Sequence, residues 1–360
     1  MDDPSTLSSD TSDPSTEESR APGRRLLWSG LLFIALTLAG LTVVYLQFAD
    51  KSVSFDWRLL APQTLLAVAT LLLVYFISDG LRLYCTLRAL GYGLPFKKVF
   101  KLVFINLFFA NVTPMATGGG FAQIWYLQRH GVPLGYATAA TTIRTVLAVI
   151  FIFSLTPFFL MTLEVLQKQT LLSDLAMALA VFITLYLGFF AVVLFRTRWL
   201  IGPLCTLISW LHRVRLLSDT RQRRWLYKIK REMLEFSQSF AEYLRGPKHW
   251  VLLSVVSTCV FLLSLFSIPA LLIYSLGYEV DYLTTLGLLV VTTFIMYVSP
   301  TPGASGISEG VFGTFFQATL TANHLILVII GWRFLTIYLG MLVGLMIVQR
   351  ELHAGRKEQQ

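Results

Sequence analysis

The sequence predicts an all-α polytopic integral membrane protein, with about six full spans and two re-entrant hairpins arranged as an inverted repeat. Composition is the first reason: of 360 residues, 55% are hydrophobic and only 14% are charged, and the mean hydropathy is +0.67. A water-soluble domain of this size is far less apolar. The second reason is that apolar runs of spanning length recur along the chain. The third is that two apolar runs end in segments rich in Pro and Gly.

The N-terminal residues 1–23 contain many Ser, Thr, Asp, Glu and Pro residues and no apolar run, so we expect a disordered cytoplasmic tail rather than a signal peptide. Residues 24–350 are expected to form a single transmembrane transport domain, followed by a cytoplasmic tail at 351–360. The net charge of +9 lies mainly beside apolar runs, where cations orient spans and meet anionic headgroups. Nucleic acid is therefore not expected as a partner.

Membrane spans are expected where an apolar run reaches the roughly 20 residues that a bilayer requires. Such runs occupy 26–48, 63–81, 135–163, 171–195, 250–275 and 325–349. Two further runs, 99–113 and 282–299, end in broken segments. In hydrocarbon, an unpaired backbone polar group costs several kcal/mol, so broken backbone at that depth must be buried in protein or line a wet path.

The distribution of charge predicts the topology, because loops rich in Lys and Arg stay in the cytoplasm. Cations precede the first run, follow the second and fill the segment 196–249, whereas the loop 276–282 carries only Glu279 and Asp281. The cations after the second run and those in 196–249 are both expected in the cytoplasm, so the chain between them crosses the membrane an even number of times. The predicted spans 135–163 and 171–195 account for these crossings, so 99–130 is expected to be a hairpin that enters from the cytoplasm. The region 282–322 becomes a hairpin that enters from outside, and both termini are cytoplasmic.

An internal repeat supports the two hairpins. Leu90-Gly91-Tyr92 begins 24 residues before Pro114, and Leu276-Gly277-Tyr278 begins 24 residues before Pro300. Each half, about 63–163 and 250–349, is then expected to contain a span, a hairpin and a span. Because the halves begin on opposite sides, this is an inverted repeat, which in secondary transporters places the site at the repeat interface near the midplane.

The insert at 196–249 combines many cations with Trp199, Trp210, Trp225 and Tyr227. This composition is typical of an amphipathic helix pair that lies on anionic lipid at the cytoplasmic surface. A solvated linker is the alternative.

Two arginines lie inside predicted spans, Arg144 in the third and Arg333 in the last. A buried Arg in a membrane is costly, so each is expected to pair with another group or to line a path. A guanidinium suits bidentate recognition of phosphate. The alternative is a structural role, in which each Arg reaches a headgroup or caps the carbonyls of a broken helix.

Two acids are candidates for partners of these arginines. Glu309 is the only acid in the second broken segment, and we expect it to be either the buried partner of Arg333 or a proton-carrying carboxylate. Asp79 lies at the cytoplasmic end of the second predicted span, and we expect it to neutralise the charge of the nearby Arg82.

The broken segments themselves supply the remaining candidates for substrate binding. Successive glycine N–H groups beside a helix N-terminus form an anion nest, although glycines also serve simply to turn a tight hairpin. The glycines concerned are Gly118, Gly119, Gly120, Gly303 and Gly306. The other residues expected along a polar headgroup path are Thr113, Pro114, Gln123, Pro300, Pro302, Ser305 and Trp332.

Catalytic and metal-binding patterns are absent from the sequence. Its five histidines form no metal-binding motif, and Cys85, Cys205 and Cys259 are isolated in or beside apolar segments. We therefore expect no enzyme activity, no cofactor and no metal.

The motifs Thr113 to Gly119 with Gln123, Pro300 to Gly306 with Glu309, and Trp332-Arg333 with Tyr338 together resemble the lysylphosphatidylglycerol synthase transmembrane family. That family includes YbhN-like inner-membrane proteins and the flippase portion of MprF, and the resemblance covers about 25–350. It implies a bacterial or archaeal cytoplasmic-membrane protein that moves or binds lipid. Ala304 departs from the usual Pro-Gly-Gly-Ser-Gly pattern. No aminoacyl transferase domain follows, so lipid lysylation is not expected.

The predicted function is a flippase-like lipid translocase for a phospholipid, an aminoacyl-phospholipid or a polyprenyl-phosphate-linked lipid. In this interpretation Arg144 and Arg333 hold the phosphate alternately from the two faces. One alternative is a non-transporting membrane subunit that presents lipid to a partner synthase or glycosyltransferase. Another is a carrier of small ions or solutes. The sequence does not decide whether the protein forms a homo-oligomer.

Overall fold

The computed structural model describes residues 54–163 and 238–357, together with isolated positions between 181 and 231. The predicted spans 26–48 and 171–195 and most of the predicted surface insert 196–249 lie outside these described residues. Throughout the described ranges the regular structure is helical. This confirms the predicted all-α class.

The first half begins with a short 3₁₀ turn, η3, which Asp56 caps through a hydrogen bond from the backbone N–H of Arg58. Pro62 then starts a long helix at the position where a proline costs no hydrogen bond. The elements of this half are η3 (Trp57–Leu60), α2 (Pro62–Ala89), α3 (Phe96–Val112), η4 (Pro114–Ala116), α4 (Thr117–Arg129) and α5 (Leu134–Thr162).

The second half repeats this order of elements. It contains α10 (Lys248–Ser275), α11 (Tyr282–Val298), η5 (Pro302–Ala304), α12 (Ile307–Phe316) and α13 (Ala322–Arg333), followed by a π-helical turn η6 (Phe334–Tyr338) and α14 (Leu339–Lys357). The helices α2 and α10 both have 28 residues, and α3 and α11 both have 17. The last three elements run on as one long helix that corresponds to α5.

The Leu-Gly-Tyr motifs end the first helix of each half in the same way. Leu90 has φ −83° and ψ 3°, and Leu276 has φ −83° and ψ 1°. The glycines that follow, Gly91 and Gly277, have φ 84° and 87°. Only a residue without Cβ adopts that backbone cheaply, so glycine makes the same turn possible in both halves.

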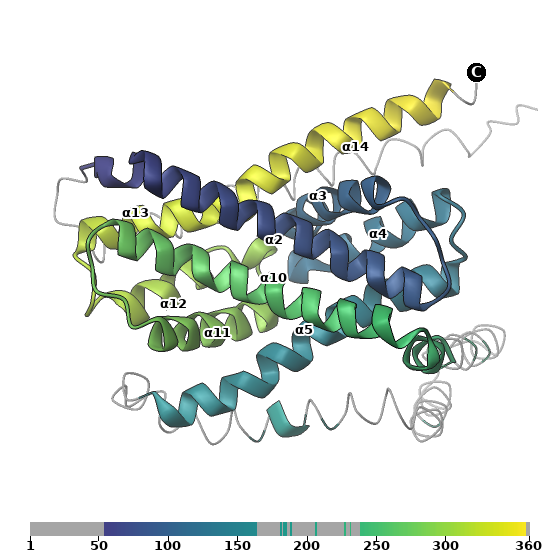
Figure 1. Cartoon of the computed structure of the whole chain (residues 1–360), viewed down its shortest axis with the longest axis horizontal. Helices are drawn as coiled ribbons and strands as arrows, with labels where there is room; N and C mark the ends of the chain where they lie inside the picture. The colour runs from purple at the N-terminus through teal and green to yellow at the C-terminus, as the bar shows by residue number, and fades with distance from the viewer. Residues whose placement is uncertain are drawn as a thin grey trace, which may run out of the picture.

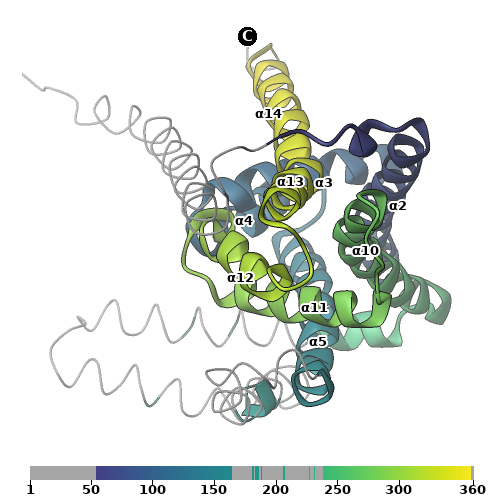
Figure 2. The same cartoon turned by 90° about the vertical axis from the view of Figure 1, so that its left-hand side faces the viewer.

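The two helix pairs that contain the breaks enter the molecule from opposite ends of its long axis. In Figure 1, α3 and α4 come from one end and α11 and α12 from the other, and the four helices converge near the middle. There η4 and η5 contact each other, and α3 also contacts η5. Figure 2 shows α2 and α10 side by side on one flank, and α5 beside α11.

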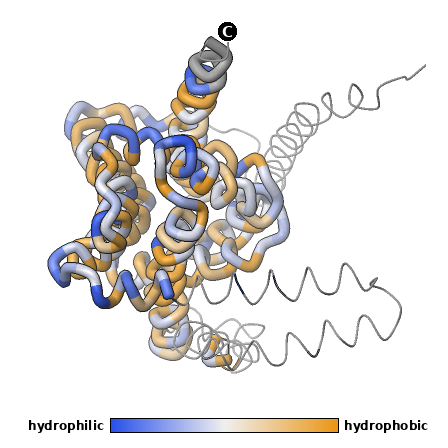
Figure 3. Tube along the Cα trace, turned by 90° about the vertical axis from the view of Figure 1, so that its right-hand side faces the viewer, coloured by the Kyte–Doolittle hydropathy of each residue, from blue (hydrophilic) through white to orange (hydrophobic). Residues whose placement is uncertain are grey.

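Four helices in the described part are long and apolar enough to cross a membrane: Pro62–Ala89, Leu134–Thr162, Lys248–Ser275 and Ala322–Glu351. They match four of the predicted spans and confirm a multi-pass membrane protein. Hydrophobic residues run along these helices, and hydrophilic residues gather in the turns that join them (Figure 3).

The last helix lies unusually close to α3. A Cβ added to Gly344 would strike the backbone carbonyl of Phe104, and one added to Gly340 would lie 2.6 Å from Leu107 Cδ1. Small residues four apart allow two helices to approach closely in a membrane. This contact positions the first broken helix pair against the helix that carries Arg333.

Candidate functional site

The two breaks begin with the same backbone conformation and then differ, because Thr117 is helical whereas Ser305 is extended. In the first, Thr113 is extended, and both Met115 and Ala116 have φ 54°. In the second, Thr301 is extended, and Gly303 and Ala304 have φ 58° and 54°. Thr-Pro-Met-Ala-Thr-Gly therefore corresponds to Thr-Pro-Gly-Ala-Ser-Gly.

This correspondence corrects the register read from the sequence. Pro114 matches Pro302 rather than Pro300, because Ser299 and Pro300 are two extra residues between α11 and the turn. Ala304, the departure from the family pattern, adopts a left-handed conformation that disfavours Cβ, as does Ala116. Strained backbone of this kind persists where surrounding structure holds it in place.

Arg333 holds the second break. Its Nε lies 2.8 Å from Glu309 Oε1, and its Nη2 donates to the carbonyl of Gly303 at 3.0 Å and to Ser305 Oγ at 3.4 Å. Arg333 is 1% exposed and Glu309 is fully buried. One guanidinium thus connects the end of α13 to both the turn and the start of α12.

Glu309 also supports the start of its own helix. Its Oε2 accepts hydrogen bonds from the Gly306 backbone N–H at 2.7 Å and from Ser308 Oγ at 2.9 Å. A glutamate at the third helical position that bonds back to the cap residue is half of a capping box. Of the two roles expected for Glu309, the ion pair with Arg333 is the one present in this geometry.

Arg144 belongs to a separate cluster on α2 and α5. Its Nη2 donates to both carboxylate oxygens of Asp79, at 2.6 and 2.7 Å. Asp79 Oδ1 also lies 2.9 Å from Arg82 Nε, and the Arg82 guanidinium stacks 4.2 Å from the centre of the Phe261 ring. All three charged residues are buried. Among the described residues two cations therefore share one anion, so this cluster carries a net positive charge.

Several buried donors among the predicted site residues have no hydrogen-bond partner within the described residues. They are Arg144 Nε, Arg333 Nη1, Gln123 Nε2 and Trp332 Nε1. A buried polar group left unpaired costs about 1–3 kcal/mol, so these groups are ready to bind water or a polar ligand. All four residues were expected along the headgroup path, and Trp332 is held by stacking on Phe312.

The predicted glycine nests are partly filled by the chain itself. The Gly118 N–H donates to Thr113 Oγ1 at 2.8 Å, just as the Gly306 N–H donates to Glu309. Gly119 packs against α3, because an added Cβ would lie 2.5 Å from Asn106 Oδ1, whereas Gly120 has open space around it. Gly118, Gly119 and Gly120 lie in the first turn of α4, where backbone N–H groups point outward from the helix end.

Sequence reasoning missed the contact of Asp79 with Arg144. It paired Asp79 with Arg82 from their spacing on one helix, a contact that is present. The contact with Arg144 joins residues 65 apart and depends on how α2 and α5 are rotated.

Side-chain contacts at both ends of the last long helix were also not predicted from the sequence. At one end His324 Nε2 lies 3.3 Å from Asp56 Oδ2, and Tyr278 Oη lies 2.8 Å from His324 Nδ1. At the other end Lys101 Nζ bonds Glu351 Oε1 at 3.0 Å. These contacts fix α13 and α14 to the first half on both sides of the buried clusters. No cluster of metal ligands occurs among the described residues.

Comparisons with known proteins place the chain among membrane proteins. The family model described as "Lysylphosphatidylglycerol synthase TM region" matches residues 19–344. A UPF0104 membrane protein of Archaeoglobus fulgidus is 23% identical over 322 residues, which cover 88% of this chain and 95% of the relative. A UPF0104 membrane protein of Methanocaldococcus jannaschii is 27% identical over 244 residues, 64% of this chain and 68% of the relative.

Proposed function

The chain belongs to the lysylphosphatidylglycerol synthase transmembrane family, and on that premise we propose that it is a flippase-like lipid translocase. The two breaks form the path for a phosphate-bearing headgroup, and the acyl chains stay in the surrounding lipid. The lipid is a phospholipid, an aminoacyl-phospholipid or a polyprenyl-phosphate-linked lipid of a bacterial or archaeal cytoplasmic membrane. The chain itself performs no covalent chemistry on it.

One observation carries this proposal: η4 and η5 approach from opposite ends and contact each other near the middle of the long axis, with η5 largely buried and η4 exposed. Broken backbone in a membrane frees carbonyl and N–H groups, which transporters place at their substrate sites. In the second break the Gly303 carbonyl lies beside the buried guanidinium of Arg333, whose Nη1 has no partner among the described residues, so a polar headgroup finds an acceptor and a donor there.

Helix length supports the interpretation of the broken pairs as re-entrant hairpins. At 1.5 Å per residue, α3 and α11 are each about 26 Å long, less than the roughly 30 Å hydrocarbon core. Lys97, Lys98 and Arg129 lie at the open end of the α3–α4 pair, whereas Glu279 and Asp281 precede α11. Cations at the first end favour a cytoplasmic position for it and for the adjacent end of α14, and the N-terminal tail is cytoplasmic too if the predicted span 26–48 crosses.

The two arginine clusters have different charges, which supports different roles for them. The Arg333–Glu309 pair is neutral and bonds to the break, so it holds the second hairpin in shape. The Arg82–Asp79–Arg144 cluster has one cation in excess. A headgroup phosphate would neutralise it, and a buried charge is stable only when it is compensated.

Reconstitution tests the proposal. The purified protein alone is placed in liposomes that contain a fluorescent phospholipid, and a membrane-impermeant reductant reports which headgroups are accessible outside. We expect quenching beyond the outer-leaflet half in vesicles with protein, and quenching of only that half in protein-free vesicles. The assay is repeated with a labelled aminoacyl-phospholipid and a labelled polyprenyl-phosphate-linked lipid. If none of the three lipids changes leaflet, the proposed translocation is wrong, and presentation of lipid to a partner synthase or glycosyltransferase becomes the better account.

A further inference from the structure

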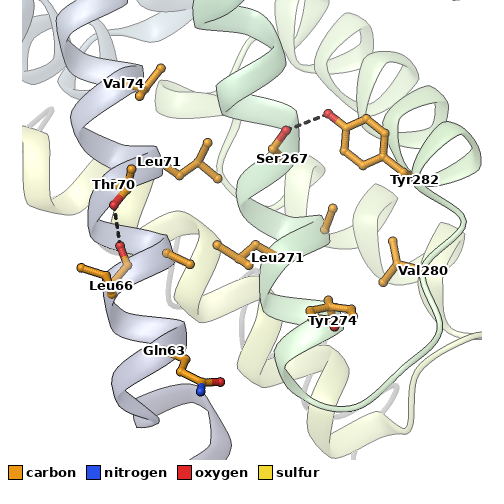
Figure 4. Close-up of a pocket in the computed structure, with 12 residues that line it drawn as sticks. Gln63, Leu66, Thr70, Leu71, Val74, Ser267, Leu271, Tyr274, Val280 and Tyr282 are labelled. Carbon is orange, nitrogen blue, oxygen red and sulfur yellow. Dashed lines mark hydrogen bonds between the residues drawn. The ribbon is translucent and has the colours of Figure 1, made fainter.

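A groove runs over the surface of α2 and α10, apart from the two breaks. Figure 4 shows its apolar walls, formed by Leu66, Leu71 and Val74 of α2, Leu271 of α10 and Val280 of the next loop. The volume is about 770 Å³. Ser267 of α10 bonds Tyr282 Oη at 2.8 Å and fixes the wall on that side.

The groove becomes polar where α2 begins and α10 ends. A second hollow of about 650 Å³ adjoins it there and shares Gln63, Ala67, Leu271 and Tyr274 with the first. Its other lining residues include Arg58 and Glu279. The combined site therefore has a long apolar part and one charged end, as an amphipathic ligand requires.

The length of the apolar part matches one leaflet of a bilayer. From Leu66 to Val74, α2 rises by about 12 Å, and from Gln63 at the polar end by about 17 Å, while half of the hydrocarbon core is about 15 Å. Both α2 and α10 are apolar enough to span a membrane, and Leu66 is 71% exposed in the groove. A groove of this length on helices that can span a membrane fits an acyl chain of one leaflet.

Arg58 supplies a free cation at the polar end. Its Nη1 donates to the Leu276 carbonyl at 3.1 Å, but its guanidinium makes no ion pair with any carboxylate in the described parts of the chain. A guanidinium with unused donors suits phosphate. Because Glu279 lines the same end, the two charges complement a headgroup that carries both phosphate and an amine.

We propose that this groove binds one zwitterionic phospholipid of the surrounding bilayer, with an acyl chain between α2 and α10 and its phosphate on Arg58. The bound lipid fills the space between the first helices of the two halves and stabilises their packing. This site is separate from the transport path, so it stands or fails independently of translocation.

Photolabelling of the full chain in liposomes tests the site. A phosphatidylethanolamine with a diazirine midway along one acyl chain is compared with a diacylglycerol that has the same chains and no phosphate. After irradiation, mass spectrometry of peptides locates the adducts. We expect the phospholipid to label the peptides that contain 63–74 and 267–274 at least about fivefold more than the diacylglycerol does.

Two variants and a matched control sharpen the result. Thr70→Trp fills the groove from an exposed position and should remove the labelling, whereas Leu73→Trp, exposed on the same helix but outside the groove, should leave it unchanged. Arg58→Gln should lower phospholipid labelling to the level of diacylglycerol. Equal labelling by the two probes, or full labelling of Thr70→Trp, would overturn the proposal.

A second measurement distinguishes variants that label poorly because they do not bind the lipid from variants that label poorly because they are unfolded. In detergent, added phosphatidylethanolamine should raise the thermal unfolding midpoint of the wild-type protein and of Leu73→Trp, because a ligand that binds only the folded state stabilises it. The same lipid should raise the midpoint of Thr70→Trp and of Arg58→Gln much less. Equal increases in all four proteins would contradict the site.

Discussion

Glu309 Oε1 lies 2.8 Å from Arg333 Nε, with both side chains buried, so that the end of α13 is joined to the start of α12 beside a break in the chain. The pair is neutral, and its charges are compensated only by each other and by nearby hydrogen bonds. Each residue therefore depends on the other for its stability in the interior.

The first prediction concerns this dependence. Glu309→Gln leaves the buried guanidinium of Arg333 without its anion, so it should destabilise the protein by about 3–5 kcal/mol. The double variant Glu309→Gln, Arg333→Gln removes both charges and should recover much of that loss. Thermal unfolding in detergent measures all three proteins. If the single variant is as stable as the wild type, the ion pair does not hold the break.

A second prediction follows from the charge imbalance of the other cluster. Asp79→Asn leaves Arg82 and Arg144 as two unpaired cations and should cost about 3–5 kcal/mol. Arg82→Gln leaves the neutral pair of Asp79 and Arg144 and loses mainly the contact with Phe261, on the order of 1 kcal/mol. The unfolding midpoints of the two variants should therefore differ clearly. Equal losses would show that net charge does not decide the stability of this cluster.

Part of the fold and part of the candidate site could be predicted from the sequence. Apolar length predicted four of the long helices, and Pro and Gly predicted where α3 and α11 end, because those residues act locally on the backbone. The two-residue difference that matches Pro114 with Pro302 was not predictable, since either proline can begin such a turn. The bond of Arg144 to Asp79 was missed because it depends on the packing of α2 against α5.

A third prediction tests the close approach of α14 and α3. Gly344→Ala places a Cβ against the Phe104 carbonyl and should destabilise the protein by about 1–3 kcal/mol. Gly120→Ala is the matched control, because that helical glycine has nothing within 4 Å, and alanine is favoured over glycine in a helix by about 1 kcal/mol. Unfolding midpoints should move in opposite directions. If Gly344→Ala left the unfolding midpoint unchanged, the stability of the protein would not depend on this contact.

A fourth prediction concerns the opposite orientation of the two hairpins. Single cysteines are placed at 129 and 322 in a background in which Cys85, Cys205 and Cys259 are alanine. In intact cells an impermeant maleimide should label position 322 but not position 129, which should react only after the membrane is opened. Labelling of both positions from the same side would rule out two re-entrant hairpins that enter from opposite faces.

The central claim is that Arg144, in the cluster with one cation in excess, meets the headgroup phosphate during translocation, while Arg333 holds the second break in shape. Removing Arg333 alone leaves Glu309 as a buried anion without its partner, so the decisive protein is the triple variant Arg144→Gln, Arg333→Gln, Glu309→Gln. It leaves the neutral pair of Asp79 and Arg82 in one cluster and no charge in the other. It should therefore fold, and its unfolding midpoint in detergent checks that it does.

The measurement is the rate of phospholipid translocation by this triple variant in liposomes, beside the wild type and the double variant Glu309→Gln, Arg333→Gln. We predict that the folded triple variant loses transport almost completely, because no guanidinium remains to meet the phosphate except Arg82, which is paired with Asp79. We predict that the double variant, which keeps Arg144, retains part of the rate. Transport at the wild-type rate by the folded triple variant would contradict the account.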